Sequence, residues 1–219
     1  MIRLSRGRKG MSASRFAAIK EVEAYWHGLR GDNDIPERSK IDPRGIQNAL
    51  PYSFILECVA PRVARLRIAG SKVSDVLGLD VRGMPATCLI APRRRALFGD
   101  ILEDVFEMPA KATINMTWDK ARSSTVQAQM ILLPLQDHEG KTTRVLGCLQ
   151  YDVLPRSGAQ TLMPLGSVVK PIVHFGQFSS PNVQSQGLTV VAGNPAVSSI
   201  KQGRETETAA PRLTLVQND

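Results

Sequence analysis

The sequence predicts an α+β domain built on a five-stranded antiparallel sheet with helices on one face. An N-terminal helix precedes the sheet and a disordered C-terminal tail follows it. Five runs alternate between apolar and polar residues, and a strand–turn–helix stretch at residues 65–83, RLRIAGSKVSDVLGLDVRG, divides two of them from the other three. After residue 154 the composition changes, because residues 155–219 hold six Pro, six Gly, seven Ser and six Gln. Such a segment has too little contiguous apolar surface to offset the entropy of ordering it.

The first helix is expected between Ser14, a suitable N-cap, and Gly31. Its apolar positions recur at three- and four-residue spacing, at Phe16, Ile19, Val22, Trp26 and Leu29. The stripe is narrow, so the helix should pack across the outside of the domain or against a second copy. Trp26 is therefore either a core anchor or a dimer contact. In the connector that follows, Asp42 is placed to cap a short turn that begins at Pro43.

The remaining elements follow from alternation, helical periodicity and breakers. Two strands separated only by Ala60-Pro61-Arg62 should pair as a hairpin. A short helix should end at Gly78, and a longer amphipathic helix should end before Pro109. The expected ranges are strands at 52–59 and 63–68, helices at 71–78 and 92–107, and strands at 111–119, 124–135 and 143–153.

Charge is concentrated at the ends of the chain. Residues 1–15, expected to be a flexible basic arm, carry five bases and no acid, whereas residues 16–154 carry 18 bases and 17 acids. A nearly neutral domain argues against nucleic-acid binding, which needs bases gathered on one folded face. The chain has no apolar window of about 18 residues for a membrane span and no secretory signal pattern, so a cytoplasmic protein is expected.

This order of elements resembles the PAS fold. Several short runs resemble more closely the PAS-domain family common in alphaproteobacteria, whose members are short single-domain proteins, and the resemblance covers residues 16–154. It implies a regulatory or sensory module, linked in family members to motility, development or stress control, with no enzymatic activity. The runs are Trp26, Leu29-Arg30, Ile35-Pro36, Ile41-Asp42-Pro43, Leu50-Pro51, residues 54–57 and residues 65–83.

Cofactor and catalytic groups are not expected. A haem-binding PAS domain would need a histidine on or near the long helix, but the three histidines are His27, His138 and His174. Cys88 lies outside any flavin-binding motif, so it is interpreted as a structural thiol, with a redox or ligand thiol as the alternative. Cys58 and Cys148 form no C-x-x-C pair, and no hydrolase, P-loop or metalloprotease motif occurs. The sequence thus predicts no metal, no cofactor and no enzyme.

Two candidate sites remain. One is an apolar cavity between sheet and helices, either filled by side chains or open to a small apolar ligand. The other is the cluster of Arg93, Arg94 and Arg95, which oppose the dipole of the long helix at its start; it is either a solvated helix end or a docking patch for an acidic partner or a phosphate-bearing ligand. The cavity would be lined by Phe54, Leu56, Leu66, Ile68, Leu97, Ile101, Val105, Ile114, Met116, Met130 and Leu132.

The sequence leaves three hypotheses of function. The first is a non-enzymatic PAS regulatory protein that acts through protein–protein contacts and forms a homodimer; its partner is not identified. The second is a nucleic-acid-associated protein that uses the basic arm and the Arg93–Arg95 cluster. The third is a sensor of a small apolar molecule.

Overall fold

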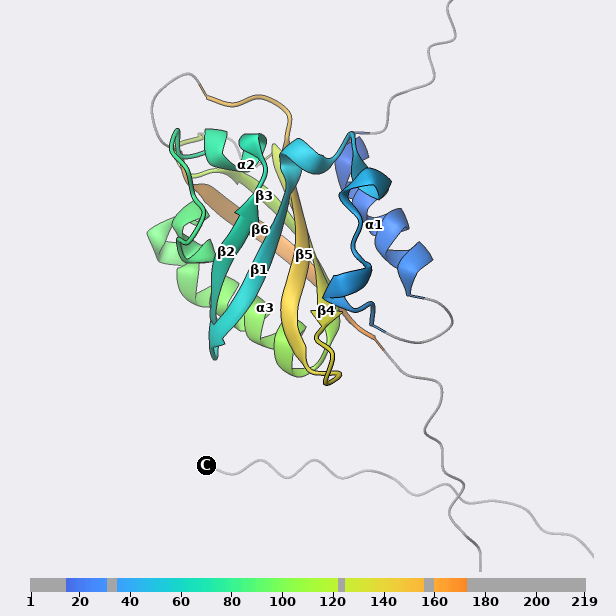
Figure 1. Cartoon of the computed structure of the whole chain (residues 1–219). Helices are drawn as coiled ribbons and strands as arrows, with labels where there is room; N and C mark the ends of the chain where they lie inside the picture. The colour runs from blue at the N-terminus through green and yellow to red at the C-terminus, as the bar shows by residue number, and fades with distance from the viewer. Residues whose placement is uncertain (1–14, 31–34, 122–124, 156–159, 173–219) are drawn as a thin grey trace, which may run out of the picture. The chain divides into compact units, whose positions relative to one another are not determined.

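The computed structural model describes residues 15–30, 35–121, 125–155 and 160–172, and these residues form a six-stranded sheet with helices packed on it (Figure 1). The predicted order of elements is confirmed up to the fifth strand. The helices are α1 (Ala17–Leu29), α2 (Ser71–Asp75) and α3 (Arg95–Glu107), with short 3₁₀ turns η1 (Arg38–Lys40), η2 (Pro43–Ile46), η3 (Leu50–Tyr52), η4 (Ala86–Leu89) and η5 (Pro92–Arg94). The strands are β1 (Ser53–Ala60), β2 (Val63–Ala69), β3 (Ala110–Trp118), β4 (Ala128–Gln136), β5 (Thr142–Tyr151) and β6 (Leu162–Pro171).

All neighbouring strands are antiparallel, in the order β2-β1-β5-β4-β3-β6. The sheet therefore has six strands instead of the expected five. The extra strand, β6, pairs with β3 along its whole length, from Ala110 opposite Pro171 to Trp118 opposite Leu162. The prediction that the disordered tail begins at residue 155 is wrong for residues 160–172, while residues 173–219 lie outside the described residues.

The physical reason for β6 is the open edge of β3. A few apolar residues suffice to order a segment when a sheet edge supplies backbone hydrogen-bond partners along its length. Leu162 is fully buried and Val169 packs against the same core. The backbone N–H of Gln160 also donates to the Val76 carbonyl at 3.0 Å, which joins the start of this segment to the end of α2.

Helices cover both faces of the sheet, so the expectation of helices on one face is incomplete (Figure 1). On one face α2 and α3 enclose the larger core, which contains Met130 and Leu132 of β4. On the other face α1 encloses a second core, which contains Ile131 and Leu133 of the same strand. Consecutive residues of β4 are thus buried on opposite faces, which explains its nearly continuous apolar run.

Two turns are held by aspartate side chains, and the one at Asp42 was predicted from the sequence. The Asp42 carboxylate accepts a hydrogen bond from the backbone N–H of Arg44 at 2.9 Å and caps η2, with Pro43 at its first position. In the turn between β4 and β5, the Asp137 carboxylate accepts from the N–H groups of Glu139 and Lys141, which lowers its pKa. Gly140 completes that turn at φ +79°, a left-handed conformation that favours glycine.

Candidate interaction surface

The predicted cavity is occupied by its own side chains. Nine of its eleven expected lining residues are only 0–3% exposed and pack together between α3 and the sheet. A cavity large enough for a ligand would leave exposed surface on the side chains around it. These nine residues therefore form a filled core; they are Phe54, Leu56, Leu66, Ile101, Val105, Ile114, Met116, Met130 and Leu132.

The other two predicted lining residues do not face this core. Ile68 is 50% exposed because the β1–β2 register shifts between Ile55 and Leu56, which pairs Ile68 with Ile55 on the outer face of the sheet. Strict alternation of inward and outward side chains after Leu66 had predicted that Ile68 faces the core. Leu97 is 39% exposed because the apolar face of α3 is centred on residues such as Phe98 and Ile101. Both assignments to the cavity are wrong.

Trp26 is a core residue of its own chain, and the prediction that its side chain forms a dimer contact is wrong. It is fully buried, and its indole Nε1–H donates to the Pro134 carbonyl of β4 at 2.9 Å. The Arg30 guanidinium lies 5.7 Å from the centre of its ring. The narrow apolar stripe of α1 is thus used against the sheet.

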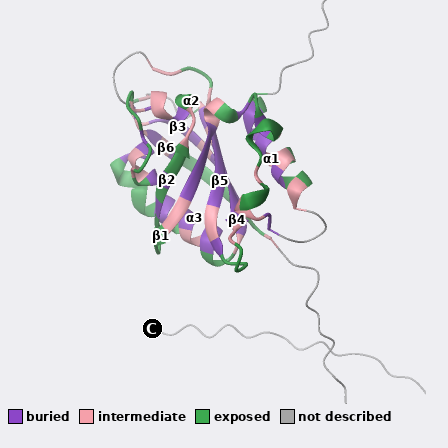
Figure 2. Cartoon of the chain, in the orientation of Figure 1, coloured by how far each residue is buried: buried purple, intermediate pink, exposed green. Residues whose placement is uncertain are grey.

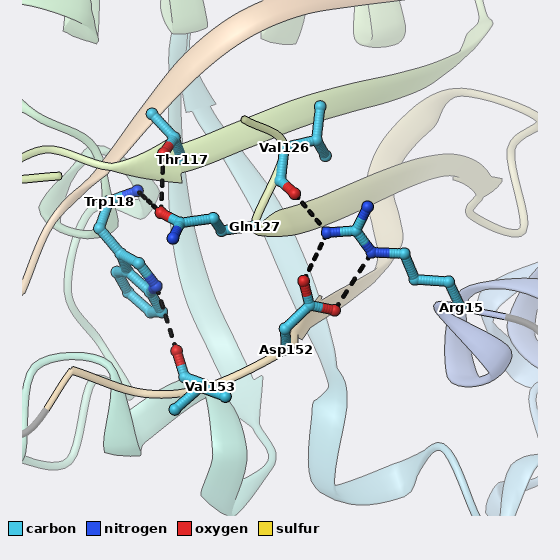
Figure 3. Close-up of polar contacts among 7 residues, drawn as sticks. All are labelled: Arg15, Thr117, Trp118, Val126, Gln127, Asp152 and Val153. Atoms are coloured by element: carbon cyan, nitrogen blue, oxygen red, sulfur yellow. Dashed lines mark hydrogen bonds and ion pairs between the residues drawn. The ribbon is translucent and has the colours of Figure 1, made fainter. Parts of the chain in front are cut away.

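Polar contacts fasten the start of α1 to the neighbouring strand ends (Figure 3). The Arg15 guanidinium pairs with the Asp152 carboxylate at 2.5 Å and also donates to the Val126 carbonyl. The N–H of Ala18 donates to Gln150 Oε1 at 2.9 Å, which satisfies one free donor at the helix start. Arg15 and Asp152 are both about half exposed, so their pair positions the helix more than it stabilises the fold.

Figure 3 also shows how the adjoining strand ends are held together. Thr117 Oγ1 donates to Gln127 Oε1 at 2.8 Å, and the Trp118 indole N–H donates to the Val153 carbonyl at 3.1 Å. These bonds tie the end of β3 to the residues before β4 and after β5. Arg15 therefore contacts a region in which the end of β3, the residues before β4 and the residues after β5 are joined by hydrogen bonds.

Two of the three arginines in the predicted Arg93–Arg95 patch make contacts within the domain. Arg93 pairs with Asp119 at 2.8 Å, and Arg95 Nε donates to the carbonyls of Thr87 and Ile90 at 3.1 and 3.2 Å. These two arginines hold the loop before α3, which explains their place at a helix start that the dipole disfavours. Arg94 is exposed. Docking at this cluster stays a prediction.

Two adjoining clefts lie on the outer face of β1, on the side of the sheet that carries α1. The first, which we call the apolar cleft, has a volume of about 120 Å³ and includes Ile41, Leu50, Ile55 and Ile68 in its lining. The second, which we call the polar cleft, has a volume of about 580 Å³ and includes Glu37, Glu57, His138 and Arg144. Arg38 lines both clefts, so they adjoin, and we refer to them together as the β1 groove.

Glu57 is the electrostatic centre of the polar cleft. Its carboxylate pairs with Arg67 of β2 through one oxygen and with Arg144 of β5 through the other. The Glu57 side chain is 18% exposed, and its two partners are 50% and 33% exposed. Two cations around one anion leave this trio with a net positive charge on the outer face. The sequence patterns had indicated none of these three charged residues as part of a site, because their proximity depends on the sheet order.

The thiols and histidines offer no preformed reactive group. Burial raises the pKa of Cys148 to about 12 and also raises the pKa of Cys88 and of Cys58. Burial lowers the pKa of His27, with the Lys111 charge as a smaller cause, so its imidazole is neutral near pH 7. Within the described residues, His, Cys, Asp and Glu form no group of three that could hold a metal ion. His174 lies outside the described part of the chain.

Comparison with known proteins identifies the family. The PAS domain family model matches residues 14–150, which is more than half of the chain, and the chain belongs to this family. The match confirms the PAS fold expected from the sequence. The finer resemblance to alphaproteobacterial members stays a prediction.

Two solved structures of light-oxygen-voltage domains are similar to part of the chain. One was studied with a flavin analogue; it is 17% identical, has a TM-score of 0.38 and covers 50% of this chain and 83% of its own. The other is the light state of the blue-light photoreceptor Aureochrome1 LOV, at 15% identity, a TM-score of 0.36 and coverage of 50% and 88%. Their light chemistry is not transferred to this chain. No curated protein matches the chain. In the described residues, no helix has the length and apolarity that a membrane crossing requires.

Proposed function

We propose that this protein is a non-enzymatic PAS regulatory module that signals through contacts with another protein. It acts in the cytoplasm, forms a homodimer, and belongs to the short single-domain PAS proteins that its sequence resembles. The observation that carries the proposal is the filled interior of a PAS domain. Nine side chains that would line an internal ligand site are 0–3% exposed. With the interior occupied, the outer surface is the part of the domain that can recognise another molecule.

The surface supports a docking role for a second reason. The β1 groove combines an apolar end with a charged end on the exposed part of a sheet, and such a combination suits recognition of a protein segment. Burial raises the pKa of all three cysteines, and the described histidines belong to no metal-binding cluster. These features favour binding over chemistry.

The test begins with native mass spectrometry of the freshly purified full chain, which reports bound ligand and oligomeric state together. We expect the mass of a dimer with no added small molecule. The tagged chain is then cross-linked in its native host, the bound protein is identified, and the complex is rebuilt from purified components. A monomer that carries a stoichiometric metabolite and yields no rebuilt complex would refute the proposal.

A further inference from the structure

The two halves of β6 are attached to the domain unequally. In the first half, Leu162 and Pro164 are buried, and the Leu162 carbonyl accepts a hydrogen bond from the Ala91 N–H at 2.9 Å. In the second half, residues 165–171, Val169 is the one residue that is partly buried, and the other six are exposed. The second half is therefore held mainly by its backbone hydrogen bonds to β3.

These backbone hydrogen bonds alternate along the strand. The Ile172 N–H donates to the Pro109 carbonyl at 2.9 Å, and these two residues continue the register of the β3–β6 pair. Hydrogen-bonded pairs recur at every second residue of an antiparallel ladder, so the N–H groups of Gly166, Val168 and Lys170 also point towards β3. Exchange of these amide hydrogens with solvent therefore reports opening of the second half.

A bulge separates the two halves of β6. The register against β3 shifts between Asn115 and Met116, which leaves Leu165 without a residue opposite it. A bulge interrupts the hydrogen-bonded ladder, so cooperative opening can stop there. The residues after Leu165 can thus separate from β3 while Met163 stays paired with Thr117.

Two lysines oppose each other in the second half. Lys170 is exposed and lies directly opposite Lys111 of β3. Like charges at directly opposed positions destabilise a strand pair. Here the Glu23 carboxylate of α1 accepts a hydrogen bond from Lys111 Nζ at 2.5 Å and neutralises the charge that Lys170 faces. An acid of the N-terminal helix thus suppresses a repulsion within the sheet.

The second core holds the same end of β6. Ile172, the residue after the strand, is partly buried and packs against this core, to which α1 contributes Ile19, Val22 and Trp26. The ion pair and the packing of Ile172 therefore both depend on the docking of α1. The first half of β6 has no such dependence, because Leu162 belongs to the larger core on the other face of the sheet.

We infer that α1 holds residues 165–172, which we call the strap, against the edge of β3 through Glu23 and the second core. When α1 loosens, the charge of Lys111 is no longer neutralised and repels Lys170, so the strap opens while residues 160–164 stay attached. Opening uncovers the edge of β3 and moves the point at which the remaining chain leaves the sheet back to the bulge. This device couples the N-terminal helix to β6 and is independent of any partner.

Amide hydrogen exchange of the full chain, followed residue by residue by NMR, tests this coupling. In Glu23→Gln, the amides of Gly166, Val168 and Lys170 should exchange at least about threefold faster than in the wild type, because loss of the ion pair raises the open population of the strap. The Met163 amide, on the other side of the bulge, should be unchanged. Glu23 is partly exposed, so the variant should fold, and circular dichroism checks this.

A double variant distinguishes repulsion between the lysines from a general loosening of α1. In Glu23→Gln/Lys170→Gln the repelling charge is absent, so exchange at Gly166 and Val168 should stay within about 1.5-fold of that in Lys170→Gln alone. Glu21→Gln is the matched control, because Glu21 is an acid of the same helix that does not pair with Lys111. It should leave exchange of the strap within about 1.5-fold of the wild type.

The packing of Ile172 is tested separately. Ile172→Ser removes apolar contact with the second core and should speed exchange at Val168 at least about threefold. Adding Lys170→Gln should not reverse this effect, because the Glu23–Lys111 pair is intact in that variant.

Three results would overturn the inference. The first is unchanged exchange of the strap in Glu23→Gln. The second is equal acceleration of Met163 and Val168, which would mean that β6 opens as a whole. The third is the same acceleration by Glu23→Gln whether or not Lys170 carries its charge, which would assign Glu23 a role in α1 alone.

Discussion

Replacement of Trp26 tests whether α1 belongs to the domain core. Trp26→Ala should lower the free energy of unfolding by about 3–5 kcal/mol, because a fully buried indole leaves a large cavity. Trp26→Phe keeps most of the apolar contact but leaves the Pro134 carbonyl without its donor, which should cost about 1–3 kcal/mol. Domains of this size have total stabilities of only about 5–15 kcal/mol.

The measurement is equilibrium unfolding in urea, followed by circular dichroism and by fluorescence of the remaining Trp118. With a urea slope of roughly 2 kcal/mol/M, the midpoint of Trp26→Ala should fall by about 2 M and that of Trp26→Phe by about 1 M. Val168→Ala is the control, since Val168 is 56% exposed and should leave the midpoint nearly unchanged.

Unfolding at several protein concentrations distinguishes the two possible roles of Trp26, as a core residue of its own chain and as a dimer contact. A core role gives the same loss of stability at low and high protein concentration. If Trp26→Ala kept the wild-type midpoint and only shifted a monomer–dimer equilibrium, the assignment of Trp26 to the core of its own chain would be refuted.

Three further predictions concern residues of the two cores. Gly147→Ala should lower the melting temperature through a cost of about 1–3 kcal/mol, because a Cβ there would overlap the Phe54 ring; an unchanged temperature in calorimetry would contradict this. Cys148 should react more slowly with iodoacetamide at pH 8.5 than Cys58, which mass spectrometry can compare. Burial raises the pKa of the Cys148 thiol in the folded protein from 9.0 to about 12. The stability that comes from keeping this thiol protonated is therefore complete below about pH 9 and is lost as the pH rises towards 12. Cys148→Ala should reduce this loss of stability, as measured by urea unfolding at each pH. Leu162→Asp should release β6 and speed amide exchange along β3, and unchanged exchange would mean that β3 does not depend on this pairing.

Much of the fold was predictable from local patterns. The β1–β2 hairpin, the cap at Asp42 and the apolar face of α3 each depend on residues close together in sequence. β6 was not predictable in this way. Its ten residues include two prolines and a glycine, and only its pairing with the open edge of β3 makes it a strand. The second core could have been inferred from the continuous apolar run of β4.

The candidate site was less predictable than the fold. Nine buried positions were identified correctly from alternation, but alternation cannot tell a filled core from a cavity. Ile68 was assigned to the wrong face because a register shift cannot be seen in the sequence of one strand. The β1 groove joins residues from the connector, β1, β2 and β5, whose proximity depends on the sheet order.

The docking of α1 has a consequence for the groove as well as for stability. The wall of the groove at residues 37–50 is fastened to α1 through Tyr25, whose hydroxyl accepts from the Asp42 N–H and whose ring lies against Gly45. Trp26, the next residue, fixes the same helix to β4. A change that loosens α1 should therefore widen the groove, even while the rest of the sheet stays folded. Figure 2 shows exposed residues along β2, and Ile68 of this strand lines the same cleft as Ile41 and Leu50 of the wall, so such a movement would change a surface that a partner can reach. The domain thus has a physical route from the docking of its N-terminal helix to the shape of its binding surface.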